Sequence, residues 1–387
     1  GKQQQDAATR GDVLMSALFS SLIRRLPWVS PALGSAPPIG LYLGPDRLDL
    51  VQMNGGAPAC LRAMSSIALP EAREQLLGDP AGLRALLRQA FASEPFRGKT
   101  VVSCLPADQV KILSLSYVLA DGQTDDQAVA VELRGRLQDE LDEMVVDYMP
   151  LRRDEGDTAE REALVALAPR TQVMAYLHLL SDAGLKVAAL DIGPAALTRC
   201  VKHTSARHFP GFPAMPNALL INFGAESSYL TVIWGRRTVL DRVIGFGESR
   251  LFERLKTVLD MPRELSLRIL CRDEEASASK AEGRGIVEEV IKPDLNLLHQ
   301  EISKTLVYMA SRTRGKSIDA LFLAGPVARY PIVVESLQQI LKVPVHILNP
   351  AVDFAPPIGR RHDEALGTTA GMALAAGLAL RGVPENE

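Results

Sequence analysis

Apolar and polar positions alternate in two segments that lie about half a chain apart, and a glycine interrupts each alternation. The segments are Ile39–Val51, with a turn at Gly44, and Leu219–Val232, with a turn at Gly224. An apolar run, a glycine turn and a second alternating run together predict a β-hairpin. Backbone N–H groups at two such turns can close on a phosphate from both sides, so the pattern favours a nucleotide cleft.

The residues after the first hairpin continue as a mixed α/β pattern. We expect a third strand at Leu61–Leu69, a helix at Pro80–Ala92 and a short buried strand at Val101–Pro106. The first part of the chain therefore reads as three strands, a helix and a further strand.

Residues 108–190 form a module of their own. The predicted strands are Val110–Tyr117, Val145–Leu151, Ala163–Pro169 and Val187–Ile192, and the predicted helices are Thr124–Glu143 and Thr171–Ala183. The first of these helices is rich in charged residues, which is typical of a solvated face. The order strand, helix, strand, strand, helix, strand predicts a small α/β subdomain.

The second hairpin begins another lobe. Its further predicted elements are strands Thr238–Ile244, Ile318–Leu323 and Val345–Leu348 and helices Ser249–Leu259, Ile332–Leu341 and Asp363–Leu380. Residues 260–316 have a mostly helical pattern, interrupted by a charged stretch that is rich in alanine and serine.

Near the N-terminus, leucines recur every four residues from Leu14 to Leu26, which predicts a short amphipathic helix over Leu14–Trp28. Two interpretations stay open for this helix. It lies in a membrane interface, or it packs on the body of the protein or on a partner. Prolines then predict a stiff linker to the first hairpin.

Composition narrows the classes of protein that fit. The chain has 387 residues, too many for one ordinary core, so two or more lobes are expected. The net charge is −3 and the basic residues are dispersed, which argues against nucleic-acid binding. The four cysteines lie far apart and the six histidines show no zinc-binding spacing, so we expect reduced thiols, no metal site and a cytoplasmic location.

Together these elements resemble the actin-like ATPase fold, an α/β fold of two lobes with related sheets flanked by helices. That fold begins each lobe with a glycine-turn hairpin and holds a nucleotide between the lobes. A third signature in the family contacts adenosine, and Leu321–Val327 is similar to it.

Within this group the chain resembles PilM, the assembly protein of type IV pili. The segments that carry the resemblance are Val102–Pro106, Val145–Tyr148, Tyr176–Lys186, Leu190–Ile192, Phe223–Leu230, Phe246–Gly247, Leu341–Val345 and Asn349–Pro350. These segments occur in the family's order and spacing, and the resemblance extends over about residues 39–382. The cytoplasmic part of the type II secretion protein GspL is also similar.

The resemblance implies a division of the chain into five parts. These are an N-terminal tail (1–38), a first-lobe core (39–107 with 191–216 and 351–387), an inserted α/β subdomain (108–190), a second-lobe core (217–248 with 317–350) and a helical subdomain (249–316).

The resemblance also implies a nucleotide site, with ATP as its ligand. The residues that match the three signatures are Gly44, Pro45, Asp46, Arg47, Asn222, Gly224, Ala225, Glu226, Ser227, Ser228, Gly325, Pro326 and Val327. No residue of the chain matches as a catalytic group.

Each signature departs from the family pattern. Tyr42 and Asn222 stand where relatives carry aspartates, and neither offers the charge that favours Mg²⁺ or the basicity for proton transfer. Pro45 and Pro326 each remove a backbone donor, and Asp46 adds negative charge near a phosphate. Three interpretations stay open: hairpins kept only as sheet, nucleotide binding without turnover, and an active ATPase.

As a partner the resemblance implies the cytoplasmic N-terminal tail of a PilN-like membrane protein, together with other pilus or secretion platform proteins. We expect its groove beside Val110, Ile112, Leu113, Leu115 and Tyr176. An extended peptide would gain affinity there from backbone pairing or apolar pockets. The protein would then lie at the inner face of the bacterial inner membrane through its partners, and a homodimer is left open.

Two other functions remain as alternatives. An actin-fold ATPase or small-molecule kinase would need a catalytic carboxylate in the cleft, which the two hairpins do not supply. A filament-forming protein like FtsA would be expected to anchor through a C-terminal amphipathic helix, whereas this chain ends in Arg381–Glu387.

Overall fold

The computed structural model describes residues 36–56, 58–150, 160–208, 216–235, 237–271, 281–313, 315–354, 369–381 and 383. The predicted helix Leu14–Trp28 lies outside the described residues, as does the first part of the predicted helix Asp363–Leu380. Among the described helices, none is both long enough and apolar enough to cross a membrane.

The first lobe is built on a five-stranded sheet with the order β3-β2-β1-β4-β8. Its strands are β1 (Ile39–Leu43), β2 (Arg47–Met53), β3 (Leu61–Ala68), β4 (Thr100–Cys104) and β8 (Lys186–Asp191). The hairpin strands β1, β2 and β3 run antiparallel, whereas β4 and β8 continue the sheet parallel to β1.

The second lobe repeats this sheet with the order β11-β10-β9-β12-β13. Its strands are β9 (Ala218–Phe223), β10 (Ser228–Trp234), β11 (Arg237–Ile244), β12 (Ala320–Ala324) and β13 (Val345–Ile347). The strand directions match those of the first sheet, position for position. Tyr42 and Asn222 consequently occupy equivalent places, two residues before their turn glycines.

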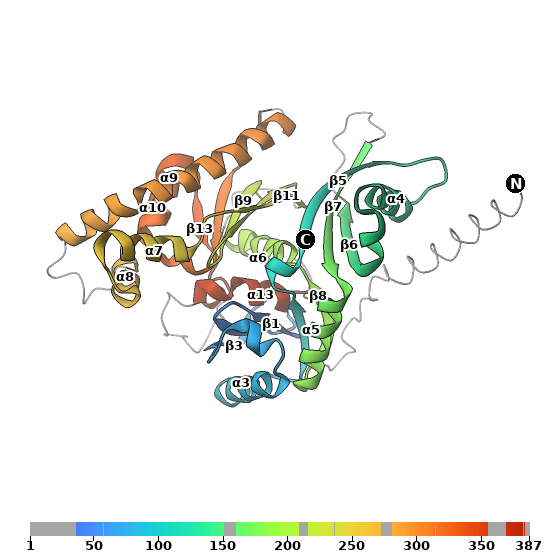
Figure 1. Cartoon of the computed structure of the whole chain (residues 1–387), viewed down its shortest axis with the longest axis horizontal. Helices are drawn as coiled ribbons and strands as arrows, with labels where there is room; N and C mark the ends of the chain where they lie inside the picture. Colours follow the sequence, from blue (N-terminus) through green and yellow to red (C-terminus); the bar gives the residue numbers. More distant parts are fainter. Residues whose placement is uncertain are drawn as a thin grey trace, which may run out of the picture.

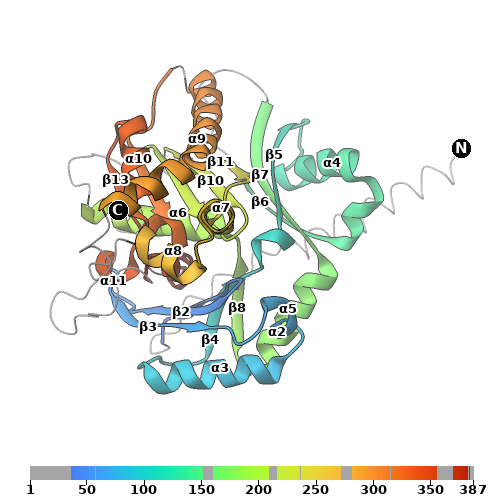
Figure 2. The ribbon, with the colours of Figure 1, turned by 60° about the vertical axis from the view of Figure 1, so that its left-hand side comes forward.

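Helices α6 (Gly193–His208) and α13 (Ala373–Ala379) lie between the two sheets (Figures 1 and 2). Residues of both sheets and both helices share one buried cluster. The close approach of α13 depends on Gly40, because a Cβ there would lie 1.9 Å from the carbonyl oxygen of Ala375. The sequence pattern did not predict α6.

The outer face of each sheet is covered by other helices. Helices α2 (Arg73–Leu76), α3 (Pro80–Ser93) and α5 (Arg170–Asp182) belong to the first lobe. The helices that cover the second-lobe sheet are α7 (Glu248–Leu259), α8 (Arg263–Leu270), α9 (Ala281–Arg312) and α10 (Pro331–Leu341). The short helix α11 (Pro350–Asp353) follows β13. Alternation sorts the side chains of β9: Leu219 and Ile221 face α7–α10, and Leu220 faces the central helices.

The inserted module is a three-stranded antiparallel sheet with the order β5-β7-β6. Its strands are β5 (Lys111–Val118), β6 (Met144–Pro150) and β7 (Glu160–Pro169). Helix α4 covers one face and runs over Asp125–Leu137, shorter than predicted, because a 3₁₀ turn takes over at Gln138–Glu143. Strands β5 and β7 of the module also contact β11 of the second lobe.

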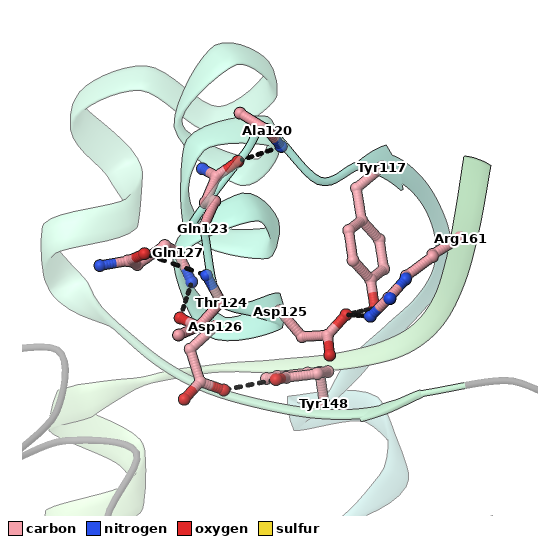
Figure 3. A network of polar contacts seen from close by, with 9 residues as sticks. All are labelled: Tyr117, Ala120, Gln123, Thr124, Asp125, Asp126, Gln127, Tyr148 and Arg161. Atoms are coloured by element: carbon pink, nitrogen blue, oxygen red, sulfur yellow. Dashed lines mark hydrogen bonds and ion pairs between the residues drawn. The ribbon is translucent and has the colours of Figure 1, made fainter. Parts of the chain in front are cut away.

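The first turn of α4 is tied to all three strands of this sheet (Figure 3). Asp125 accepts hydrogen bonds from the Tyr117 hydroxyl and from Arg161, both at 2.7 Å. Asp126 accepts a hydrogen bond from the Tyr148 hydroxyl. Acidic groups in a first turn also complement the helix dipole. These contacts hold α4 on one face of the sheet and leave the opposite face to the first lobe.

Candidate functional site

The three predicted signature loops meet at one cavity of about 580 Å³ between the two lobes. The predicted residues that line it are Gly44, Pro45, Asp46, Arg47, Asn222, Gly224, Ala225, Gly325 and Pro326. Four other predicted residues, Glu226, Ser227, Ser228 and Val327, are not among its lining residues. Ser228 is buried and donates to the carbonyl of Phe246, and Val327 lies in the second-lobe core.

The two hairpins make the same kind of turn. The Gly44 amide donates to the Arg47 carbonyl at 2.9 Å, and the Gly224 amide donates to the Ser227 carbonyl at 3.1 Å. At the third loop, Gly325 has a φ of +86°, and a Cβ there would lie 2.0 Å from the carbonyl oxygen of Phe223. Only glycine fits this approach of β12 to the end of β9.

The second turn is joined to the start of α7. The amides of Glu248 and Ser249 donate to the carbonyls of Gly224 and Ala225 at 3.0 and 2.8 Å. Amides at a helix N-terminus can bind a phosphate when they are free. Here these two are used within the protein and do not serve a ligand.

Cross-strand pairing places one residue of the neighbouring strand beside Tyr42 and another beside Asn222. Tyr42 pairs with Asp49 across the first hairpin, and Asn222 pairs with Tyr229 across the second. Directly paired residues share a face of the sheet, and all four line the cavity. A carboxylate therefore lies beside Tyr42 on the neighbouring strand of the first hairpin.

Asp49 is a buried carboxylate, only 5% exposed. The Ser66 hydroxyl donates to it at 2.5 Å, and Arg47 in turn donates to that hydroxyl at 2.6 Å. Burial raises the pKa of Asp49 to about 7, although the Ser66 hydrogen bond and Arg47 act in the opposite direction.

Asp241 on β11 is a second acid at the cavity. It accepts from the Thr231 hydroxyl at 2.5 Å, and burial raises its pKa to about 6. Burial also raises the pKa of Tyr42, which keeps that phenol neutral.

Where α7 and α8 border the cavity, the Glu248 carboxylate accepts hydrogen bonds from three side chains. Arg329 and Arg263 approach it at 3.1 and 3.3 Å, and the Tyr330 hydroxyl also donates to it. Both arginines line the cavity, together with the apolar side chain of Leu267. This end combines hydrogen-bonding groups with an apolar surface.

The groups present do not fit a divalent-cation site. Tyr42 and Asn222 are neutral, and the buried acids Asp49 and Glu248 each accept hydrogen bonds from internal donors. Within the described residues, no three His, Cys, Asp or Glu side chains lie close enough together to hold a metal ion.

A second cavity, of about 570 Å³, lies between the inserted sheet and the first lobe. We call it the groove. Its apolar wall includes Val145, Met149, Leu164, Ala166, Ala168, Leu190, Ile192, Ala195 and Leu380. Its charged and polar groups are Asp147, Asp191, Arg199, His203 and Arg381. Asp191 is held by ion pairs with Arg199 and Arg381.

The groove residues predicted from the sequence do not come together. Val110 lines the groove, and both Val110 and Ile112 line the cleft. Leu113 and Leu115 point to the opposite face of β5, where they pack in the cluster formed with α4. Tyr176 is buried in the first-lobe core, with its hydroxyl 2.9 Å from that of Ser103.

The reason is the period of two along a strand, which turns neighbouring side chains to opposite faces. A set that mixes odd and even positions of β5 cannot line one surface. The alternating positions Val145, Asp147 and Met149 of β6 and Leu164, Ala166 and Ala168 of β7 share one face, which the sequence interpretation missed.

Comparison with known proteins identifies the family. A family model described as "Type IV pilus assembly protein PilM" matches residues 55–383. The chain belongs to the PilM family. Among solved structures it is similar to a "PilM-PilN type IV pilus biogenesis complex", with 23% identity, 90% of this chain and 99% of that chain covered, and a TM-score of 0.68.

Other solved structures are more distant. The ethanolamine utilization protein EutJ from Carboxydothermus hydrogenoformans has 14% identity over 94% of this chain and 96% of its own, with a TM-score of 0.48. The cytoplasmic domain of EpsL, an inner membrane component of the type II secretion system of Vibrio cholerae, has 11% identity over 79% and 95%, with a TM-score of 0.35. The fold of this PilM family member is the actin-like ATPase fold, as predicted.

Proposed function

We propose that this chain is a scaffold of a type IV pilus or related secretion platform, which binds the cytoplasmic N-terminal tail of a PilN-like membrane protein in the groove. The observation that carries the proposal is the groove itself, an apolar cavity of about 570 Å³ beside an open strand. The match to the PilM family and the similarity to a PilM–PilN complex support the choice of partner.

The groove suits an extended peptide. Strand β6 is at the edge of its sheet, and β8 is at the edge of the first-lobe sheet, so each offers backbone groups for pairing. Apolar side chains of the tail would enter between Val145, Met149 and Ala166. Asp147 and Arg381 would fix its register through charge.

In this proposal the protein is attached to the membrane through its partner. A tail that emerges from a membrane-spanning protein would hold the scaffold at the inner face of the bacterial inner membrane. The cleft would bind a nucleotide without efficient hydrolysis. Tyr42 and Asn222 supply neither a general base nor a ligand for Mg²⁺, and the carboxylates of Asp49 and Asp241, which line the cleft, each accept a hydrogen bond from an internal hydroxyl.

A titration with a matched pair of variants tests the groove. The probe is a fluorescent synthetic peptide with the cytoplasmic N-terminal residues of the PilN protein from the same organism. Val145→Asp places a charge in the groove, and Val131→Asp places the same charge on α4, where Val131 is 66% exposed.

We expect Val145→Asp to weaken peptide binding at least tenfold and Val131→Asp to leave it unchanged, with both variants folded by circular dichroism. Binding that Val145→Asp does not affect would contradict the assignment of the groove. Absence of binding to the parent protein would contradict the proposed partner.

A further inference from the structure

We propose that the cleft takes up protons when it binds an anionic, phosphate-bearing ligand, and that the protons go to Asp49 and Asp241. The inference rests on the proposed function, because it takes the cleft as a nucleotide site. It adds a dependence of that site on pH and names one residue in each lobe that causes it.

The charged side chains around the cavity balance one another when all of them are ionised. Among the described residues that line it, the acidic ones are Asp46, Asp49, Asp241 and Glu248. The basic ones are Arg47, Arg242, Arg263 and Arg329. A ligand with several negative charges would therefore meet no excess of positive charge. Protonation of two of the acids would leave positive charge in excess and make the cavity attractive to such a ligand.

Asp46 and Glu248 are poorly suited to take up these protons. Asp46 is exposed, so water compensates its charge, and Glu248 is paired with Arg263 and Arg329. Asp49 and Asp241 lack such compensation. Within the described part of the chain neither of them makes an ion pair, and each accepts a hydrogen bond from a hydroxyl at 2.5 Å.

The groups that face Asp49 do not neutralise it. They are Tyr42 on β1, Ser66 on β3, and Arg47 and Asp46 in the turn. Arg47 directs its donors to the hydroxyl and the carbonyl of Ser66, at 2.6 and 2.9 Å. Helix α13 and the 3₁₀ turn Ala370–Met372, which also pack against β2, carry no titratable side chain.

Asp241 on β11 is partly buried and has equally few charged neighbours. Thr231 and Tyr229 of β10 face it, and burial raises the pKa of Tyr229, which keeps that phenol neutral. Helix α6 and strands β5 and β7 also pack against β11, but their charged side chains do not contribute to the pKa of Asp241. Arg242, the next residue of β11, pairs with Glu301.

Both carboxylates can bind a proton near neutral pH. Burial raises the pKa of Asp49 to about 7 and that of Asp241 to about 6. A ligand of nucleotide size would occupy most of a cavity of about 580 Å³, so it would lie against both carboxylates whichever way round it binds. Negative charge brought in by the ligand then favours the protonated form of each.

The sign of the pH dependence follows from linkage. Above about pH 7 the empty cleft has lost these protons and must regain them on binding, so affinity falls as the pH rises. Below about pH 6 the protons are largely in place and the affinity levels off. Asp49 alone gives a change of about tenfold between pH 6 and pH 8, because each pH unit above its pKa costs a factor of about ten.

Calorimetric titration of the full chain with ATP in EDTA, at pH 6, 7 and 8, tests the proposal. The variants are Asp49→Asn and Asp241→Asn, which keep the shape of the side chain without its charge. The matched control is Asp121→Asn, at an exposed position outside the cleft. Phosphate groups also titrate in this range, so each variant is compared with the parent at the same pH.

We expect the dissociation constant of the parent to rise at least tenfold from pH 6 to pH 8. At pH 8, Asp49→Asn and Asp241→Asn should each bind ATP about tenfold more tightly than the parent, a gain that a misfolded variant would not show. Asp121→Asn should bind ATP as the parent does.

ATP binding that neither cleft substitution strengthens at pH 8, or that Asp121→Asn strengthens as much, overturns this inference alone. If ATP does not bind to the parent at any of the three pH values, the nucleotide site of the proposed function falls as well.

Discussion

Replacing Asp49 with asparagine should stabilise the protein above neutral pH and have little effect in acid. Asp49 is buried beside Tyr42 in the cleft, and its pKa is raised by burial to about 7 from an ordinary value of 3.8. Its charged and polar neighbours are Ser66, Arg47 and Asp46. Asparagine can accept the same Ser66 hydrogen bond without a charge.

The sign follows from proton binding. Between about pH 4 and pH 7 the folded protein keeps the Asp49 proton, whereas the unfolded chain has lost it, so the free energy of unfolding falls as the pH rises. One pKa unit corresponds to about 1.4 kcal/mol, so the loss amounts to about 4 kcal/mol at most. The asparagine variant carries no such loss and should exceed the parent by up to that amount at pH 8.

Urea unfolding at pH 4.5, 6 and 8 measures this difference, with Asp121→Asn as the control for an exposed aspartate. The variant should exceed the parent by only about 1 kcal/mol at pH 4.5, and the difference should grow towards pH 8. A difference that is the same at all three pH values would refute the reasoning, because it would come from packing and not from ionisation.

Three further substitutions test other parts of the structure. Gly325→Ala should lower the free energy of unfolding by about 3 kcal/mol or more, because its Cβ would overlap the Phe223 carbonyl, whereas Gly122→Ala, also at positive φ but with open space around it, should cost about 1 kcal/mol. Leu115→Ala should cost about 3 kcal/mol in urea unfolding and leave tail affinity unchanged, since Leu115 faces α4; a large loss of affinity in a folded variant would count against this orientation. Tyr176→Phe should cost about 1 kcal/mol through the lost contact with Ser103, and an unchanged melting temperature would show that this hydrogen bond does not stabilise the fold.

The sequence pattern predicted the strands of the two large sheets, and the resemblance to the actin-like ATPase fold predicted that the three signature loops meet. Both hairpins have a local signature, an apolar run that ends at Gly44 or Gly224, and the strand that leads to Gly325 is uniformly apolar. Because the two sheets have the same strand order, equivalent turns come to the same cleft. The local pattern was therefore enough for the two hairpin turns, whereas the third loop was placed through the resemblance.

The groove could not be predicted in the same way. Its walls come from β6, β7, β8, α6 and the residues around Leu380, which are far apart in the sequence. Which face of β5 meets α4 depends on the strand order β5-β7-β6, which periodicity does not reveal. Helix α6 was missed because it begins with Gly193-Pro194 and its polar residues weaken the apolar pattern.

The unusual position of Asp49 could have been recognised from the sequence. It is the one acidic residue among the apolar positions of β2, Leu48, Leu50 and Val51. An acid within a buried strand costs free energy unless it has partners. Its relation to Tyr42 appeared only with the register of the hairpin.

The most direct test of the scaffold proposal is amide hydrogen exchange of the full chain with and without the PilN tail peptide. The account predicts slower exchange in β6 (Met144–Pro150) and β8 (Lys186–Asp191), the strands that border the groove, and no change at the two hairpin turns. Slower exchange confined to the turns at Gly44 and Gly224, or to a surface away from the groove, would contradict it.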